Sequence, residues 1–220
     1  MYLLTMAAAN FADFYVRRRL FAPAEPMQTV RNFAAFGSLV RAGIVSDLIT
    51  LAGSIVLIAA LYVILKPVNR TLTFVAVFWW LMECALAALV TLNSLAVFFF
   101  VNGGEFSHRF DSSQLGMLAQ TFISVDRAGN RIAAIFFGLG SILFCYLWFK
   151  SRFIPRALAG WGMLASLVPI LAPLMTILFP DFIDAPLRRA RSGFPIMIFE
   201  VILGLWLLVK GIRMPTIRAE

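Results

Sequence analysis

Apolar residues dominate six segments of the chain, and short polar stretches separate them. A helix needs about 20 mostly apolar residues to cross a membrane, and the six segments approach or meet that length. Neither strand alternation nor a heptad repeat competes with this pattern. The predicted helices cover residues 2–16 (or to 21), 43–65, 72–101, 131–149, 155–179 and 193–209. The pattern predicts an all-α membrane protein, a bundle of six transmembrane helices in a single membrane domain over residues 1–220.

The connections between these helices differ in length and charge. Two parts of the longer polar connections, 26–42 and 114–130, are predicted as surface helices. The three short stretches KPVNR, KSRFIPR and KGIRMPTIR carry eight Lys and Arg residues. Short basic loops are typical of the cytoplasmic side, which favours both termini inside. A count of Lys and Arg alone places eleven of them on the opposite side. The predicted orientation therefore rests on the shortness of the three stretches.

Composition supports the membrane assignment and excludes a common alternative. Hydrophobic residues form 61% of the chain and charged residues 14%, whereas soluble domains are about half apolar and a quarter charged. The net charge of +8 would suggest nucleic acid in a soluble protein, but here the bases lie in clusters between apolar segments. We therefore expect membrane lipid around the chain and no nucleic acid. The basic cluster RRR follows the first apolar segment, unlike a signal peptide, so that segment is interpreted as a retained helix.

Several strings along the chain resemble a bacterial membrane family known as domain of unknown function 4386. These strings are YLLT at 2–5, FADFYVR at 11–17, RAGIVSDLI at 41–49, LKPVN at 65–69, FFGLGSILFCYL at 136–147 and WLLVKG at 206–211. They occur in order and cover almost the whole chain. The resemblance implies a multi-pass protein of the bacterial inner (cytoplasmic) membrane and no particular reaction. In that family a His often stands where this sequence has Gly140.

Two carboxylates lie near the middle of predicted membrane helices. Counted from the cytoplasmic ends at about 1.5 Å per residue, Glu83 is roughly 16 Å deep and Glu200 roughly 14 Å deep. Half of the hydrocarbon core is about 15 Å. A charged side chain facing lipid there costs about 2.5–3.5 kcal/mol even on a lenient scale. We therefore expect both to point into the bundle, to share one interior polar site, and at least one to be protonated.

Other polar side chains fall within a few residues of the same level. Asn10, Ser54 and Ser166 are predicted to complete a proton- or ligand-binding site with the two carboxylates. The alternative is that neutral hydrogen bonds among these groups hold the helices together without further function.

A second polar layer is predicted nearer the outer face. Asp47 and Arg131 share a depth of about 27 Å, which permits a structural ion pair. Asp47 is alternatively an ordinary helix-start residue. Asp13 and Arg17 are four residues apart, as in routine surface pairs.

Catalytic signals are weak. No nucleophile elbow, zinc-protease motif or phosphate-binding loop occurs in the sequence, and we expect no cofactor, no metal site and no catalytic residue. Cys84 and Cys145 are predicted to remain free thiols, because about 12 Å of depth separates them. Gly138 and Gly140 are predicted to permit a close helix contact.

Three function classes remain from the sequence. The first is a small transporter or binder of a proton-coupled or amphipathic ligand. The second is an accessory or structural subunit of a larger membrane complex, with other membrane proteins as partners. The third is an intramembrane lipid-modifying enzyme, which lacks an evident nucleophile or metal ligands, so that an enzyme is the least favoured class.

Overall fold

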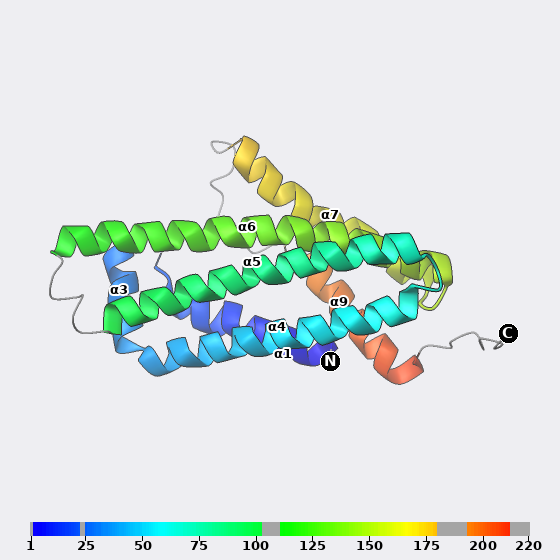
Figure 1. Ribbon diagram of the computed structural model, residues 1–220, viewed down its shortest axis with the longest axis horizontal. Coiled ribbons are helices and arrows are strands. Elements are labelled where there is room, and N and C mark those ends of the chain that lie inside the picture. The colour runs from blue at the N-terminus through cyan, green and yellow to red at the C-terminus, as the bar shows by residue number, and fades with distance from the viewer. Residues whose placement is uncertain (1, 23–24, 103–110, 180–192, 212–220) are drawn as a thin grey trace. The chain divides into compact units, whose positions relative to one another are not determined.

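The computed structural model describes residues 2–22, 25–102, 111–179 and 193–211. Within these ranges every regular element is a helix. The elements are α1 (Tyr2–Asn10), η1 (Phe11–Arg17), α2 (Arg18–Leu20), α3 (Pro26–Ala35), α4 (Gly37–Leu65), α5 (Arg70–Asn102), α6 (Ser112–Ser151), α7 (Arg156–Leu178) and α9 (Phe194–Lys210) (Figure 1). The all-helical prediction is confirmed for the described part of the chain.

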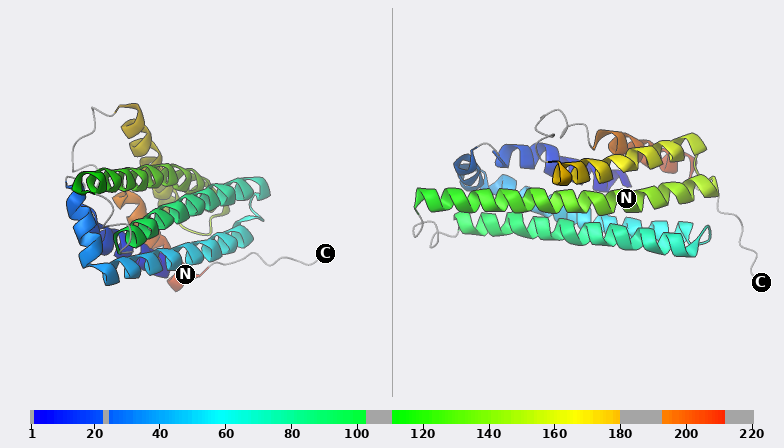
Figure 2. Two further views of the ribbon diagram at one scale, coloured as in Figure 1. Left: turned by 60° about the vertical axis from the view of Figure 1, so that its left-hand side comes forward. Right: turned by 90° about the horizontal axis from the view of Figure 1, so that it is seen from above.

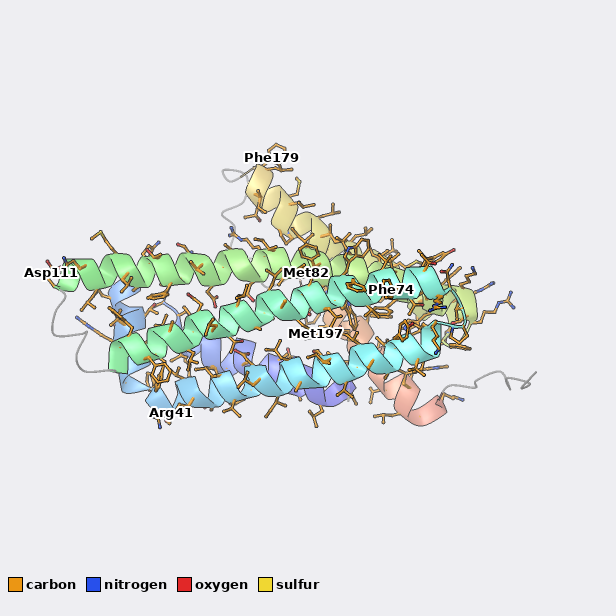
Figure 3. The ribbon with its side chains drawn as sticks, viewed as in Figure 1. Arg41, Phe74, Met82, Asp111, Phe179 and Met197 are labelled. Atoms are coloured by element: carbon orange, nitrogen blue, oxygen red, sulfur yellow. The ribbon has the colours of Figure 1, made fainter. Side chains whose placement is uncertain are left out.

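Four described helices are long and apolar enough to cross a membrane: α4, α5, α6 and α7. Only 22% to 44% of their most apolar windows is buried, so most of that apolar surface faces outward. Large side chains on it are half exposed, such as Phe74 at 53% and Met82 at 48%, and both project from α5 in Figure 3. Lipid is the solvent that such a surface requires. The chain is therefore a membrane protein.

The longest helix joins two elements that the sequence analysis separates. The predicted surface helix over 114–130 is wrong as a separate element, because α6 is continuous through it (Figures 1 and 2). Its 40 residues give a length of about 60 Å, twice the hydrocarbon thickness of about 30 Å. Asp111 and Gln114 begin it with a reciprocal cap, since each side chain accepts from the other's backbone N–H at 2.8 and 3.1 Å. Asp111 is labelled at that end in Figure 3.

The chain divides into two compact units, 1–57 with 81–133 and 58–80 with 134–220. In the first unit, α3 packs on the end of the first helical run. The Asn32 amide donates to the carbonyls of Arg19 and Leu20 at 3.0 and 3.2 Å, which satisfies two groups that a helix end leaves open. An apolar core lies beside this contact. Its buried members are Val16, Leu20, Phe33, Val40, Val97 and Phe98.

In the second unit, small residues allow helices to approach closely. A Cβ at Gly138 would lie 2.9 Å from the Ser166 carbonyl on α7. A Cβ at Gly140 would lie 2.3 Å from Cδ1 of Trp80, whose indole N–H donates to the Phe137 carbonyl and to the Ser141 hydroxyl. The close helix contact predicted for the two glycines is confirmed.

Candidate functional site

Arg17 links three helical segments of the first unit. It is the last residue of η1, and its Nη2 lies 3.1 Å from Oδ2 of Asp47 on α4. Its Nη1 lies 2.8 Å from Oδ1 of Asp126 on α6. The three side chains are only 13% to 20% exposed. Bonds of this charge-assisted kind are stronger than neutral hydrogen bonds, so they fix how the three segments meet.

The local fold explains why Arg17 points inward. The segment FADFYVR forms a seven-residue π-helix, and a π-helical turn takes one residue more than an α-helical turn. Side chains after it are therefore offset by one residue from the α-helical register. Of the three consecutive arginines, Arg17 faces α4 and α6, whereas Arg18 and Arg19 are exposed. The Arg19 guanidinium lies over the Tyr15 ring, 4.4 Å from its centroid.

Asn130 supports the ion bridge from α6. It stands one turn after Asp126, and its amide donates to the Asp126 carbonyl at 2.9 Å and to Oδ2 of the same residue at 3.2 Å. One carboxylate oxygen of Asp126 thus faces Arg17 and the other faces Asn130. This arrangement holds the Asp126 side chain in one orientation.

A polar cavity adjoins this bridge within the first unit. It has a volume of about 150 Å³, enough for several water molecules but below the 300–1,000 Å³ that is usual for drug-sized ligands. Glu83, on α5, stands in its wall beside Cys84, whose thiol lies 3.5 Å from Oε2. The lining residues are Ala9, Arg17, Asp47, Thr50, Leu51, Ser54, Glu83, Cys84, Ala87, Val90, Thr91 and Asn130.

Two of the hydroxyl groups in this wall, those of Thr50 and Thr91, act mainly as acceptors towards other groups. Thr50 donates to the Ser46 carbonyl at 2.9 Å, and Thr91 donates to the Ala87 carbonyl at 3.0 Å. A hydroxyl has one proton to donate and two lone pairs. Because each proton is used within its own helix, the Thr50 and Thr91 oxygens present lone pairs to other groups.

The predicted midplane residues fall into both units. Glu83 and Ser54 line the same cavity. The Asn10 amide donates to the Met6 carbonyl at 2.8 Å, within its own helix. Ser166 and Glu200 belong to the second unit, where the Ser166 hydroxyl donates to the Gly162 carbonyl at 2.6 Å. The common site of Glu83 and Glu200 stays a prediction.

The remaining sequence predictions concern one ion pair and the two cysteines. The guanidinium bonded to Asp47 is that of Arg17, while Arg131 is exposed on α6. Cys84 and Cys145 are both free, as predicted. In the ranges that the structure describes, no three His, Cys, Asp or Glu side chains are placed to hold a metal ion.

The roles of Arg17, Asp126 and Asn130 do not follow from the sequence pattern. In that pattern Arg17 resembles a surface residue, and Asp126 and Asn130 lie at the water-facing end of a separate helix. The available signal was their spacing, since Asp126 and Asn130 are four residues apart and share a helix face. That face contacts Arg17 because α6 continues unbroken past it.

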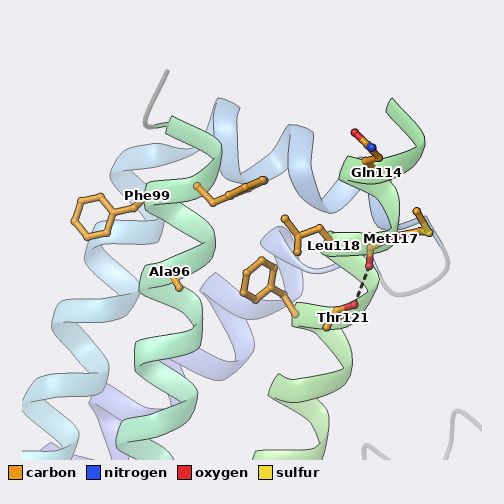
Figure 4. A pocket seen from close by; sticks show the side chains of 8 residues that line it. Ala96, Phe99, Gln114, Met117, Leu118 and Thr121 are labelled. Carbon is orange, nitrogen blue, oxygen red and sulfur yellow. Dashed lines mark hydrogen bonds between the residues drawn. The ribbon is translucent and has the colours of Figure 1, made fainter. Parts of the chain in front are cut away.

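A larger groove lies between α5 and α6 in the same unit (Figure 4). Its volume is about 720 Å³, and apolar side chains such as Phe99, Met117 and Leu118 line it. The Thr121 hydroxyl on its wall donates to the Met117 carbonyl at 3.0 Å. None of the described residues that line the groove is charged, unlike those of the cavity beside Glu83.

Comparison with known proteins identifies a family but no individual relative. A family model described as Domain of unknown function (DUF4386) matches residues 1–211. No curated protein and no solved structure matches the chain.

Proposed function

The chain belongs to the DUF4386 family, whose model covers almost all of it. Because apolar helices surround a polar cavity, we propose that the protein is a small transporter or binder in the bacterial inner membrane. Its ligand is small, binds in the cavity beside Glu83 and is coupled to protons through that carboxylate. Four other residues of the cavity wall contribute to ligand binding: Asp47, Arg17, Ser54 and Asn130.

Six transmembrane helices fit this proposal. Beyond the four long helices, α9 has 17 residues, about 25 Å in length, at the lower end of what spans a bilayer. The run from Tyr2 to Leu20 is helical throughout, as α1, η1 and α2 follow one another without a gap. These two segments supply the first and last spans.

The proposed topology places both termini and the three short basic connections in the cytoplasm. In a variant without Cys84 and Cys145, a single cysteine at Lys66 or Lys150 should react with a membrane-impermeant maleimide in inverted vesicles and not in spheroplasts. A cysteine at Asp111, at the other end of α6, should show the opposite pattern. Labelling of positions 66 and 150 from opposite sides would contradict the topology.

One observation carries the proposed function: the Glu83 carboxylate lines a polar cavity inside otherwise apolar helices. An ionisable group in the membrane is costly and usually marks a site for a ligand, an ion or a proton. A carboxyl group that only joins helices needs a hydrogen-bonding partner on another helix. It does not need open volume beside it. Here about 150 Å³ of volume lies beside the carboxylate.

Native mass spectrometry of the protein extracted from its own membrane tests this function. The wild type should carry a stoichiometric small molecule, and Glu83→Gln should lose at least about 90% of it. Glu25→Gln is the matched control, because Glu25 is exposed before α3, and this variant should keep the molecule. If neither form carries a small molecule and both carry stoichiometric protein partners, the chain is an accessory subunit instead.

A further inference from the structure

Among the residues that the structure describes, the wall of the Glu83 cavity holds more acidic than basic side chains. Two carboxylates, Glu83 and Asp47, and one guanidinium, Arg17, stand in the lining. The Arg17 guanidinium also bonds Asp126, at 2.8 Å. Charges interact more strongly away from bulk water. This wall therefore attracts positive groups more than negative ones.

Three uncharged polar groups of the wall, those of Thr50, Thr91 and Asn130, match the same kind of ligand. The hydroxyl protons of Thr50 and Thr91 are donated within their own helices, and the Asn130 amide donates to Asp126. What these groups retain are oxygen lone pairs. A ligand that brings N–H donors would use them together with the carboxylates.

The rest of the wall is hydrocarbon. Side chains of Leu51 and Val90 stand in the lining with the alanines at 9 and 87. A short alkyl group can pack against these side chains. A hydrated inorganic ion fits less well, because its bound water would contact apolar carbon atoms. The volume of about 150 Å³ limits that alkyl group to a few carbon atoms.

From this wall we infer that the cavity takes a small organic cation, an ammonium group carrying a short alkyl chain. The inference rests on the proposed function and names its ligand class. The ammonium group lies between Glu83 and Asp47, and the alkyl chain lies against Leu51 and Val90. Arg17 keeps Asp47 in position through its bond at 3.1 Å.

This inference is tested by thermal unfolding of the purified protein in detergent. The probes are methyl-, ethyl- and propylammonium chloride. A ligand that binds only the folded state raises Tm in a saturable way. At least one of the three should raise Tm by roughly 3 °C or more. Sodium acetate and ethanol, of similar size, should not raise Tm, and sodium chloride keeps the ionic strength constant.

Three variants make the result specific to the cavity. Glu83→Gln should lose the ammonium-dependent shift, Glu83→Asp should weaken it, and Glu25→Gln should retain it. Circular dichroism and gel filtration identify any variant that fails to fold. If Glu83→Gln fails to fold, Glu83→Asp still tests the site, because it keeps the carboxylate and shortens the side chain.

Three results would overturn the inference. The first is that no ammonium raises Tm, the second is that acetate or ethanol raises Tm equally, and the third is that Glu83→Gln keeps the full ammonium shift. If Glu83→Gln nevertheless releases a co-purified molecule, the proposed function stands and only the ligand class is wrong. If the ammonium shift is the same in Glu83→Gln and wild type, the cavity is not its site.

Discussion

Replacing Arg17 with Gln should lower the free energy of unfolding by about 3–5 kcal/mol, the cost of breaking a buried ion pair. The substitution removes the positive charge that faces both Asp47 and Asp126. Their carboxylates, 18% and 13% exposed, would then repel each other with little water to solvate them. Denaturation of the purified protein in mixed micelles, followed by circular dichroism, measures the loss.

Arg19→Gln is the matched control for this prediction, because it makes the same change two residues along the chain. Arg19 is exposed and contacts the Tyr15 ring, so its loss should cost at most about 1 kcal/mol. Adding Asp47→Asn and Asp126→Asn to Arg17→Gln should recover part of the stability, since the uncompensated charges disappear. Equal stability of the Arg17 and Arg19 variants would show that the bridge contributes nothing.

Gly140→Ala should destabilise the second unit by about 1–3 kcal/mol through overpacking. The added Cβ would lie 2.3 Å from Cδ1 and 2.8 Å from Nε1 of Trp80, and 3.2 Å from the Ala76 carbonyl. The indole cannot retreat cheaply, because its N–H is bonded to Phe137 and Ser141. The same denaturation measurement applies, with Gly160→Ala as control, since a Cβ there meets nothing within 4 Å.

A double-mutant cycle identifies Trp80 as the cause. Trp80→Ala alone should cost about 3–5 kcal/mol. In that background, Gly140→Ala should be neutral or stabilise by up to about 1 kcal/mol, because Ala favours the helix more than Gly does. An unchanged cost of Gly140→Ala without the indole would contradict the steric explanation.

Hydrophobic pattern and length were sufficient to predict the helices but not all of their limits. The predicted starts at 72, 155 and 193 lie within two residues of those observed for α5, α7 and α9. The prediction failed where polar residues lie inside a continuous helix. Asp126 and Asn130 resemble the end of a surface helix in sequence, yet their contacts with Arg17 and each other allow α6 to continue past them.

The candidate site was partly predictable for a related reason. Depth along a helix can be counted, and this placed Glu83 and Ser54 at one level, where both line the cavity. The direction in which a side chain points depends on the helix register, and η1 changes that register just before Arg17. No periodicity of apolar residues signals a π-helix, so the pairing of Arg17 with Asp47 and Asp126 required the structure.

The ion bridge of Arg17 also sets an order of events during synthesis of the chain. Asp47 follows Arg17 by 30 residues and Asp126 follows it by 109. At about 5–20 residues per second, the two carboxylates leave the ribosome about 2–6 s and about 5–20 s after the guanidinium. During that interval the nascent first helix must rely on water, lipid headgroups or the insertion machinery to solvate Arg17. The amino-terminal segment therefore reaches its final position only when the translation of α6 is well advanced.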